Sequence, residues 1–116
     1  LTDEGRADPV LSQVPQTFPI FQWHTDTFTL PEGAVHLAQS STARHQAFRI
    51  GRATYGTQLH FEASRAVVAD WYRRFPDRME ESSPGWSEAY PSLNATHGSK
   101  ADRHGLSLAR AWISLI

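Results

Sequence analysis

The sequence predicts a single α/β domain in which a mixed sheet is flanked by helices. Short runs of aromatic and β-branched residues fill the first half of the 116-residue chain. Near residue 66 the spacing of apolar residues changes to a helical period. The alternating strand–helix units of a complete doubly wound domain are missing. Strands followed by helices therefore indicate a layered α/β arrangement and one domain at most.

The predicted strands follow a polar segment, residues 1–17, which contains two prolines and should be an irregular lead-in. Four segments have the composition of strands: 18–23, 35–38, 46–50 and 54–61. Gly51-Arg52 should form the turn between the last two strands. Gly56, inside the last strand, indicates a bulge or a close approach of another group.

Two helices are predicted in the second half. The first has Ser64 as its N-cap and ends at Pro76. Residues 77–98 should be mostly loop. The last helix begins between Ser99 and Asp102, and Gly105 within it predicts close packing. Its expected apolar stripe consists of Leu106, Ala109, Trp112, Ile113 and Ile116.

Composition excludes several classes of function. Eleven basic and twelve acidic residues give a net charge of −1, without the basic excess of a nucleic-acid-binding protein. The absence of cysteine removes disulfides, thiolate metal sites and a cysteine nucleophile from this chain. No apolar run approaches the roughly 18 residues of a membrane span, and no secretory signal is recognisable. We therefore expect no nucleic-acid or membrane partner, and a cytoplasmic location.

Two of the six histidines are followed, two positions later, by an acid: His24 by Asp26 and His60 by Glu62. His60 and Glu62 end a predicted strand, where residues i and i+2 share a face about 6.5 Å apart. The carboxylate could fix the imidazole tautomer and leave the other ring nitrogen to act as a base. The alternative is a surface His–Glu contact without a function.

The remaining histidines lie in polar or turn contexts and should be exposed to solvent: His36, His45, His97 and His104. A metal site is a further alternative. His24, Asp26 and His60 together have the donor types of a two-histidine, one-carboxylate site.

Four segments, in the correct order, resemble class I, triad-type glutamine amidotransferases. Residues 55–62, YGTQLHFE, are similar to the G-x-Q-F-H-x-E segment of that family, and residues 21–28, FQWHTDTF, to its W-H-G-D segment. Residues 30–40 are similar to its L-P-x-G-A…L-A-x-S stretch, and QAFRIG at 46–51 matches Q-A-F-R-x-G. The resemblance covers about residues 18–64 and extends to the final helix, 101–116. It is nearest to stand-alone proteins related to the amidotransferase part of GMP synthase.

The resemblance implies that residues 1–116 are the C-terminal part of a flavodoxin-like domain that hydrolyses the side-chain amide of glutamine, or a related γ-glutamyl amide, to release ammonia. In that family a cysteine thiolate attacks the amide, a histidine transfers protons and a glutamate orients the histidine. These last two roles fall to His60 and Glu62. Substrate binding falls to Trp23, Thr25 and Asp26, with His24 bonding within the loop. No metal or organic cofactor is implied.

The sequence departs from the family pattern at three points. Phe61 replaces the frequent proline, Thr25 replaces the usual glycine, and the G-x-C-x-G elbow that carries the nucleophile is absent. Because Leu1 is not a start methionine, we expect a longer reading frame, with the cysteine-bearing half upstream or on a partner chain. The chain alone should then be inactive. The alternative is a non-catalytic relative that acts as an interaction or regulatory subunit, and an open sheet edge would allow a homo-oligomer.

Overall fold

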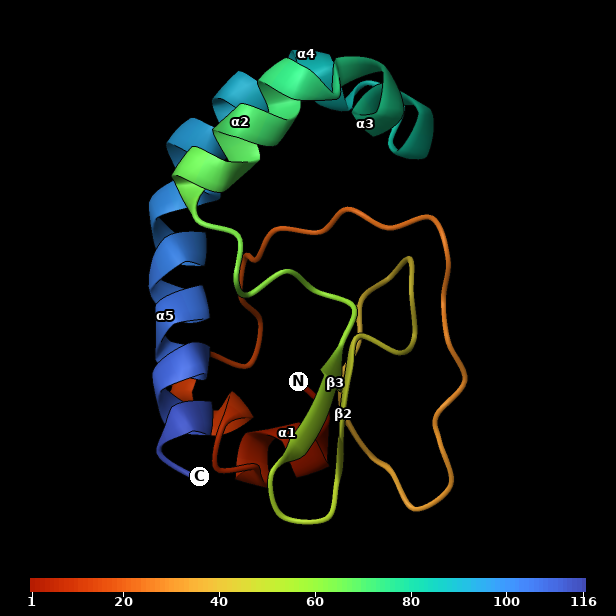
Figure 1. Cartoon of the computed structure of the whole chain (residues 1–116), viewed down its shortest axis with the longest axis vertical. Coiled ribbons are helices and arrows are strands. Elements are labelled where there is room, and N and C mark those ends of the chain that lie inside the picture. The colour runs from red at the N-terminus through yellow and green to blue at the C-terminus, as the bar shows by residue number, and fades with distance from the viewer.

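The computed structural model describes residues 1–116 and contains a three-stranded sheet, ordered β1-β2-β3 (Figure 1). β1 spans Val35–Ala38, β2 Ala47–Ile50 and β3 Thr54–Thr57. Both neighbouring pairs are antiparallel. Parallel neighbours require a crossover of about a dozen residues or more, so the short links here leave only antiparallel pairing. The α/β class is confirmed in this coarse form, but the expectation of a mixed sheet was wrong.

The hairpin between β2 and β3 turns at Gly51, whose φ of +60° favours glycine. Gly56 lies opposite Phe48 in the ladder, and a Cβ at this position would overlap the Phe48 ring. The close approach expected at Gly56 is therefore present. It is made by an aromatic side chain across the strand pair, and the β2–β3 register runs without a bulge.

The first residues are folded, and the expectation of an irregular lead-in was wrong. Helix α1, Asp3–Ala7, is capped by the Thr2 hydroxyl, which accepts a hydrogen bond from the Gly5 N–H at 2.9 Å. A single 3₁₀ turn, Leu11–Gln13, follows. This segment folds because its few apolar residues enter the core, where their burial outweighs the polar composition around them.

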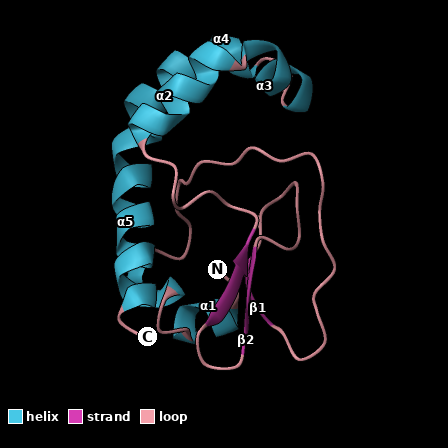
Figure 2. Cartoon of the chain, in the orientation of Figure 1, coloured by secondary structure: helices cyan, strands magenta, loops and turns pink.

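The hydrophobic core lies between this N-terminal segment, the sheet and the last helix. Its buried members are Val10, Leu11, Val14, Leu37, Ala38, Ala47, Leu59 and Leu108. Figure 2 shows the same division, with the strands and α1 at one end of the molecule and a group of helices at the other. The sheet and the helical group are thus held together by one long helix and by the loops beside it.

Residues 18–23 form no strand, so this prediction was wrong. Pro19 has no N–H to contribute to a ladder. A single backbone hydrogen bond, from the His60 N–H to the Phe21 carbonyl at 2.9 Å, joins this segment to the end of the hairpin. The predicted strand 54–61 also ends early, at Thr57.

The first predicted helix is confirmed as α2, Arg65–Arg74. The Ser64 hydroxyl accepts a hydrogen bond from the Val67 N–H at 3.3 Å and caps its N-terminus. Pro76 ends α2, as expected, and it also begins α3, Pro76–Ser82, because proline is well tolerated at the first position of a helix.

Residues 77–98 are mostly helical, so the prediction of a loop was wrong. α4 spans Trp86–Leu93 and passes through a π-helical turn, Asn94–Gly98, directly into α5, Ser99–Ile113. The helix forms despite Pro91 because Trp86 and Tyr90, one turn apart, both pack on Tyr72 of α2. None of the helices combines the length and the apolar character needed to cross a membrane.

Helix α5 begins where expected, but its buried face differs from the predicted stripe. Gly105 and Leu108 are buried, whereas Ile113 and Ile116 are 61% and 76% exposed. A Cβ at Gly105 would overlap the carbonyl oxygen of Phe61, so this glycine sets which face of α5 approaches the hairpin. The close packing predicted at Gly105 is confirmed, while the outer apolar residues of α5 remain in solvent.

Candidate functional site

His60 and Glu62 lie just after β3, in a turn that the Phe61 side chain anchors to the core. The His60 Nδ1 atom is 2.7 Å from Glu62 Oε1, so the contact expected from the i, i+2 spacing is present. The His60 side chain is 26% exposed and that of Glu62 is 58% exposed. The pair is therefore open to solvent, and a small molecule could approach it.

The second ring nitrogen of His60 also has a contact, with a backbone carbonyl group. His60 Nε2 lies 3.1 Å from the backbone carbonyl oxygen of Trp23. A neutral imidazole carries only one N–H and cannot donate to two oxygens at once. The contact with Trp23 therefore has to open before Nε2 could take a proton from a nucleophile.

Aromatic rings hold the His60 imidazole from the side. The Phe21 and Trp71 rings each lie 5.7 Å from it, centroid to centroid, and Trp71 meets it edge-on. Trp71 also packs on the Trp23 ring at 5.6 Å. These contacts restrict the rotation of the imidazole and couple its position to the segment that contains Trp23.

The three residues predicted to bind substrate are only partly gathered at His60. Trp23 is half-buried and contacts His60 through its backbone carbonyl, while its ring packs on Trp71 and Phe75. The side chains of Thr25 and Asp26 are exposed. The loop that carries them is held by the His24 ring, which bridges Gln22 Oε1 and the Asp26 carbonyl at 3.1 Å each. The expected bonding of His24 within the loop is thus present.

A cleft of about 700 Å³ opens beside this loop, between residues 19–27 and the helices α2 to α5. Trp23, Thr25 and Asp26 line one wall of it, whereas His60 and Glu62 do not. Its volume falls within the range typical of small-molecule sites, about 300 to 1,000 Å³. Substrate bound by the predicted residues in this cleft would therefore be separated from His60 by the backbone of residues 21–23.

The metal alternative has no support in the geometry. No group of three His, Asp or Glu side chains is placed to hold a metal ion, so His24, Asp26 and His60 do not form a donor set. His24 directs its two ring nitrogens at oxygens of its own loop. The His60 nitrogens are directed at Glu62 and Trp23.

Three of the four histidines expected in solvent are instead half-buried and hold backbone carbonyls. His36 Nε2 contacts the carbonyl oxygens of Ala38 and Arg44, at 2.9 and 2.8 Å. His45 contacts the carbonyl of Phe28, and His104 that of Pro19. These carbonyl oxygens receive few hydrogen bonds from backbone N–H groups. The imidazole rings supply the missing donors. His97 alone is exposed as expected.

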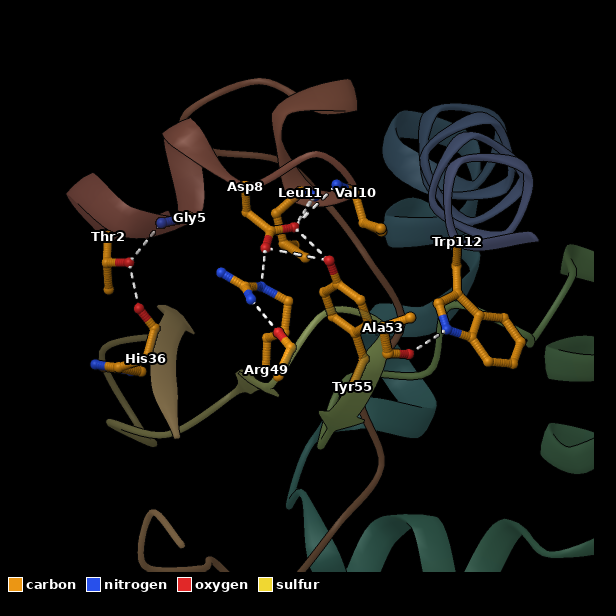
Figure 3. Close-up of polar contacts among 11 residues, drawn as sticks. Thr2, Gly5, Asp8, Val10, Leu11, His36, Arg49, Ala53, Tyr55 and Trp112 are labelled. Atoms are coloured by element: carbon orange, nitrogen blue, oxygen red, sulfur yellow. Dashed lines mark hydrogen bonds and ion pairs between the residues drawn. The ribbon is translucent and has the colours of Figure 1, made fainter. Parts of the chain in front are cut away.

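A buried polar cluster surrounds Asp8 (Figure 3), and the sequence patterns did not predict it. Asp8 is fully buried, and its carboxylate accepts hydrogen bonds from the Val10 and Leu11 N–H groups and from Arg49 and Tyr55. Burial, together with the Asp8 charge and hydrogen bond, raises the pKa of Tyr55 to about 12. Asp readily accepts hydrogen bonds from backbone N–H groups two and three residues further along the chain, so the Asp8-Pro9 pair is a turn signal that the sequence does contain.

Comparison with known proteins identifies no family. No protein-family model matches the chain, and no curated protein matches its sequence significantly.

Proposed function

We propose that this chain supplies the histidine–carboxylate pair of a glutamine amidotransferase-type amide hydrolysis, together with a cysteine nucleophile from outside these 116 residues. The observation that carries the proposal is the 2.7 Å contact between His60 Nδ1 and Glu62 Oε1 at the end of the β2–β3 hairpin. The four matched sequence segments support it. In this proposal the sheet and α5 are the C-terminal part of a flavodoxin-like domain.

The chemistry follows from what a stable amide requires. The thiol proton passes to His60, the sulfur bonds to the amide carbonyl carbon, and the carbon–nitrogen bond breaks as the imidazolium protonates the departing NH₂ group, which leaves as ammonia. Water then gives a proton to the imidazole and attacks the thioester, which releases glutamate and returns the thiol. Glu62 stabilises the imidazolium in both steps and holds its orientation. The donors of an oxyanion hole would come with the nucleophile.

The contact between His60 Nε2 and the Trp23 carbonyl defines an additional requirement. The nucleophile has to take the place of this carbonyl oxygen at Nε2, which means that residues 21–26 shift when the cysteine-bearing part arrives. Such a shift has to open the packing of the Trp23 ring on Trp71 and Phe75, whereas the residues that follow Trp23 are bonded by His24 only within the loop. Movement of residues 21–26 would also open the cleft, which Thr25 and Asp26 line, toward His60.

The test is ammonia release from L-glutamine, measured on the full product of the gene that encodes this chain, with any cysteine-bearing partner encoded beside it. The 116-residue chain by itself should release none. With the nucleophile present, His60→Ala should lower kcat/KM by about 100- to 10,000-fold. Glu62→Gln should give a smaller loss, because it removes the orienting charge but leaves the imidazole.

Glu88→Gln is the matched control, since Glu88 is an exposed carboxylate in the first turn of α4 and contacts neither residue of the pair. It should leave the rate unchanged. A folded, cysteine-containing product that releases no ammonia would contradict the proposal. So would a His60→Ala variant that keeps the full rate.

A non-catalytic role as an interaction subunit is the second candidate. The observation that favours it is the exposure of Leu106 and Ile113 on α5 and of Ile116 just beyond its end. Exposed apolar residues grouped on one helix face are typical of association surfaces. The two functions are separated by His60→Ala, which would leave an interaction subunit fully active in its biological assay and would inactivate an amidase.

A further inference from the structure

The two edges of the sheet differ in how they are covered. At the β1 edge the N-terminal segment supplies hydrogen bonds: the Thr2 N–H donates to the Leu37 carbonyl at 3.0 Å, and the Thr2 hydroxyl donates to the His36 carbonyl at 2.7 Å. Gly5 packs so close to Leu37 that a Cβ at this glycine would overlap the Leu37 carbonyl oxygen. At the β3 edge no strand takes this place, and Figure 1 shows no element drawn in front of β3.

The backbone groups of Tyr55 and Thr57 are unpaired along the β3 edge. The Gln58 N–H donates to the Gln46 carbonyl, on the β2 side, at 2.8 Å. Because the bonds of an antiparallel ladder alternate along a strand, Gly56 also faces β2, while Tyr55 and Thr57 direct their N–H and C=O groups to the other side. No backbone or side-chain group of the chain bonds to them there. These donors and acceptors match the backbone of an extended polypeptide.

Strand β3 has none of the features that commonly prevent sheet edges from pairing. Its sequence, TYGT, contains no charged residue and no proline, and its register with β2 has no bulge. Thr54 and Thr57 are exposed to solvent. A further strand could therefore pair with β3 without a like charge or a missing donor in its way.

Helix α5 lies beside this open edge. The Trp112 indole N–H donates to the Ala53 carbonyl, in the turn before β3, at 3.0 Å. In Figure 3, Arg49 of β2 lies to one side of Tyr55 and Trp112 lies to the other. A groove of about 130 Å³ separates β3 from α5, and its lining is almost entirely apolar and aromatic, with Leu108 and Trp112 on the helix side.

The apolar surface of α5 continues beyond this groove. Around the helix, Ile113 follows Trp112 on the side away from the buried Leu108, and Leu106 lies on the same side as Ile113, seven residues earlier. Ile113 and Leu106 are 61% and 51% exposed. A strand added to β3 would lie next to Trp112, where these two side chains could cover it. The unpaired edge and the uncovered apolar side of α5 therefore call for the same kind of partner.

We propose that the β3 edge binds one extended strand of a second polypeptide, whose alternate apolar side chains pack against α5. The partner's backbone would exchange hydrogen bonds with Tyr55 and Thr57, and its apolar face would cover Ile113 and Leu106, as in other cases of strand addition to a sheet edge. The inference is independent of the proposed amide hydrolysis, because neither His60 nor Glu62 lines the groove or belongs to β3.

The test uses a probe peptide, acetyl-Lys-Thr-Val-Thr-Val-Thr-Lys-amide, in which valines alternate with threonines and the terminal lysines keep the peptide soluble. Hydrogen exchange of single backbone amides is followed by NMR in the ¹⁵N-labelled chain. In the free chain the Tyr55 and Thr57 amides should exchange much faster than the Gly56 amide. With the peptide at ten times its Kd, their exchange should slow about tenfold. The same peptide methylated at every central backbone nitrogen should give no protection.

Two variants of the chain locate the binding surface. Thr57→Pro removes the outward N–H without breaking a bond to β2, so it should weaken peptide binding about tenfold. Thr57→Val is the matched control, since it keeps the N–H and should keep the affinity. Ile113→Asn changes only an exposed side chain and should weaken binding about fivefold, because it removes apolar cover. Lys100→Asn, an exposed change in the first turn of the same helix, should have no effect.

The amide spectrum of each variant reports whether it is folded, and Ile113→Asn carries the test if Thr57→Pro does not fold. Unchanged exchange at Tyr55 and Thr57 with the peptide present would overturn the proposal. So would equal affinities of the unaltered chain and a folded Thr57→Pro or Ile113→Asn variant. Protection of the Tyr55 and Thr57 amides that rises with the concentration of the chain alone would also overturn it, because the edge would then pair with a second copy of this chain.

Discussion

The Tyr55 hydroxyl donates a hydrogen bond to the Asp8 carboxylate at 3.0 Å and so joins the N-terminal segment to the edge strand of the sheet. The same carboxylate accepts hydrogen bonds from the Val10 and Leu11 N–H groups and pairs with Arg49 Nε at 2.8 Å. A fully buried carboxylate is tolerated only when its oxygens are satisfied in this way. The Asp8 cluster therefore holds residues 1–17 against β2 and β3.

Replacing Asp8 should destabilise the whole domain. Asp8→Ala leaves Arg49 and Tyr55 without their partner and removes the acceptor of the Val10 and Leu11 N–H groups, which should cost about 3 to 5 kcal/mol. Asp8→Asn should cost less, because an amide oxygen can still accept from the backbone N–H groups. Urea unfolding measures both free energies. The control is Asp3→Ala, which breaks only an exposed ion pair with Arg6 and should cost at most about 1 kcal/mol. Similar losses at positions 3 and 8 would contradict this account.

Tyr55 should make stability depend on alkaline pH. Its pKa is raised from 10.0 to about 12, so the folded protein binds the phenolic proton more tightly than the unfolded chain does. The resulting stabilisation is complete below pH 10 and is lost as the pH rises from 10 towards 12. Tyr55→Phe should be less stable at neutral pH, by about 1 to 2 kcal/mol, and should lose less stability across that interval. Thermal or urea unfolding at pH 8 to 12 measures the slope, and an equally steep slope in Tyr55→Phe would refute the assignment.

Gly105→Ala should destabilise the protein although alanine favours helices. A methyl group at this position meets the backbone carbonyl of Phe61, which cannot rotate away, so α5 has to move from the hairpin. The cost of overpacking, about 1 to 3 kcal/mol, should exceed the roughly 1 kcal/mol gained in helix propensity. Because Phe61 lies between His60 and Glu62, the His60 ring signals should shift in the NMR spectrum as well.

Ser107→Ala, two residues further along α5, is the control for this substitution. Ser107 makes no side-chain hydrogen bond, so alanine there should be neutral or slightly stabilising and should leave the His60 signals in place. A Gly105→Ala variant as stable as Ser107→Ala would show that the contact with Phe61 is not tight.

Tyr72 and Pro91 should be energetically coupled. In an α-helix the Ser87 carbonyl would accept from the N–H of residue 91, which proline lacks. The Tyr72 hydroxyl donates to this carbonyl instead, at 3.2 Å. Tyr72→Phe should cost about 1 kcal/mol in the natural sequence and less in a Pro91→Ala background, where the helix supplies its own donor. A double-mutant cycle of unfolding free energies measures the difference. Additive effects would mean that the hydroxyl does not compensate for the proline.

Local signals were reliable where neighbouring residues alone decide the structure. The β2–β3 hairpin, the Ser64 cap and the break at Pro76 all depend on turn chemistry or capping within a few residues. The contact between His60 and Glu62 belongs to the same group, because a spacing of two in extended chain brings the side chains together. Their role in catalysis stays a prediction.

The errors arose where distant segments compete with local preference. A polar opening segment folds because Val10, Leu11 and Val14 find the core, and residues 77–98 become helical because their aromatic rings pack on α2. Periodicity could not tell which apolar face of α5 is buried, since the contact of Gly105 with Phe61 lies 44 residues back along the chain. The amino-acid order thus specifies turns, caps and the acid–histidine spacing. The packing of remote elements specifies the Asp8 cluster, the cleft and the position of Trp23 against His60, because burial and hydrogen bonding there depend on groups that meet only after folding.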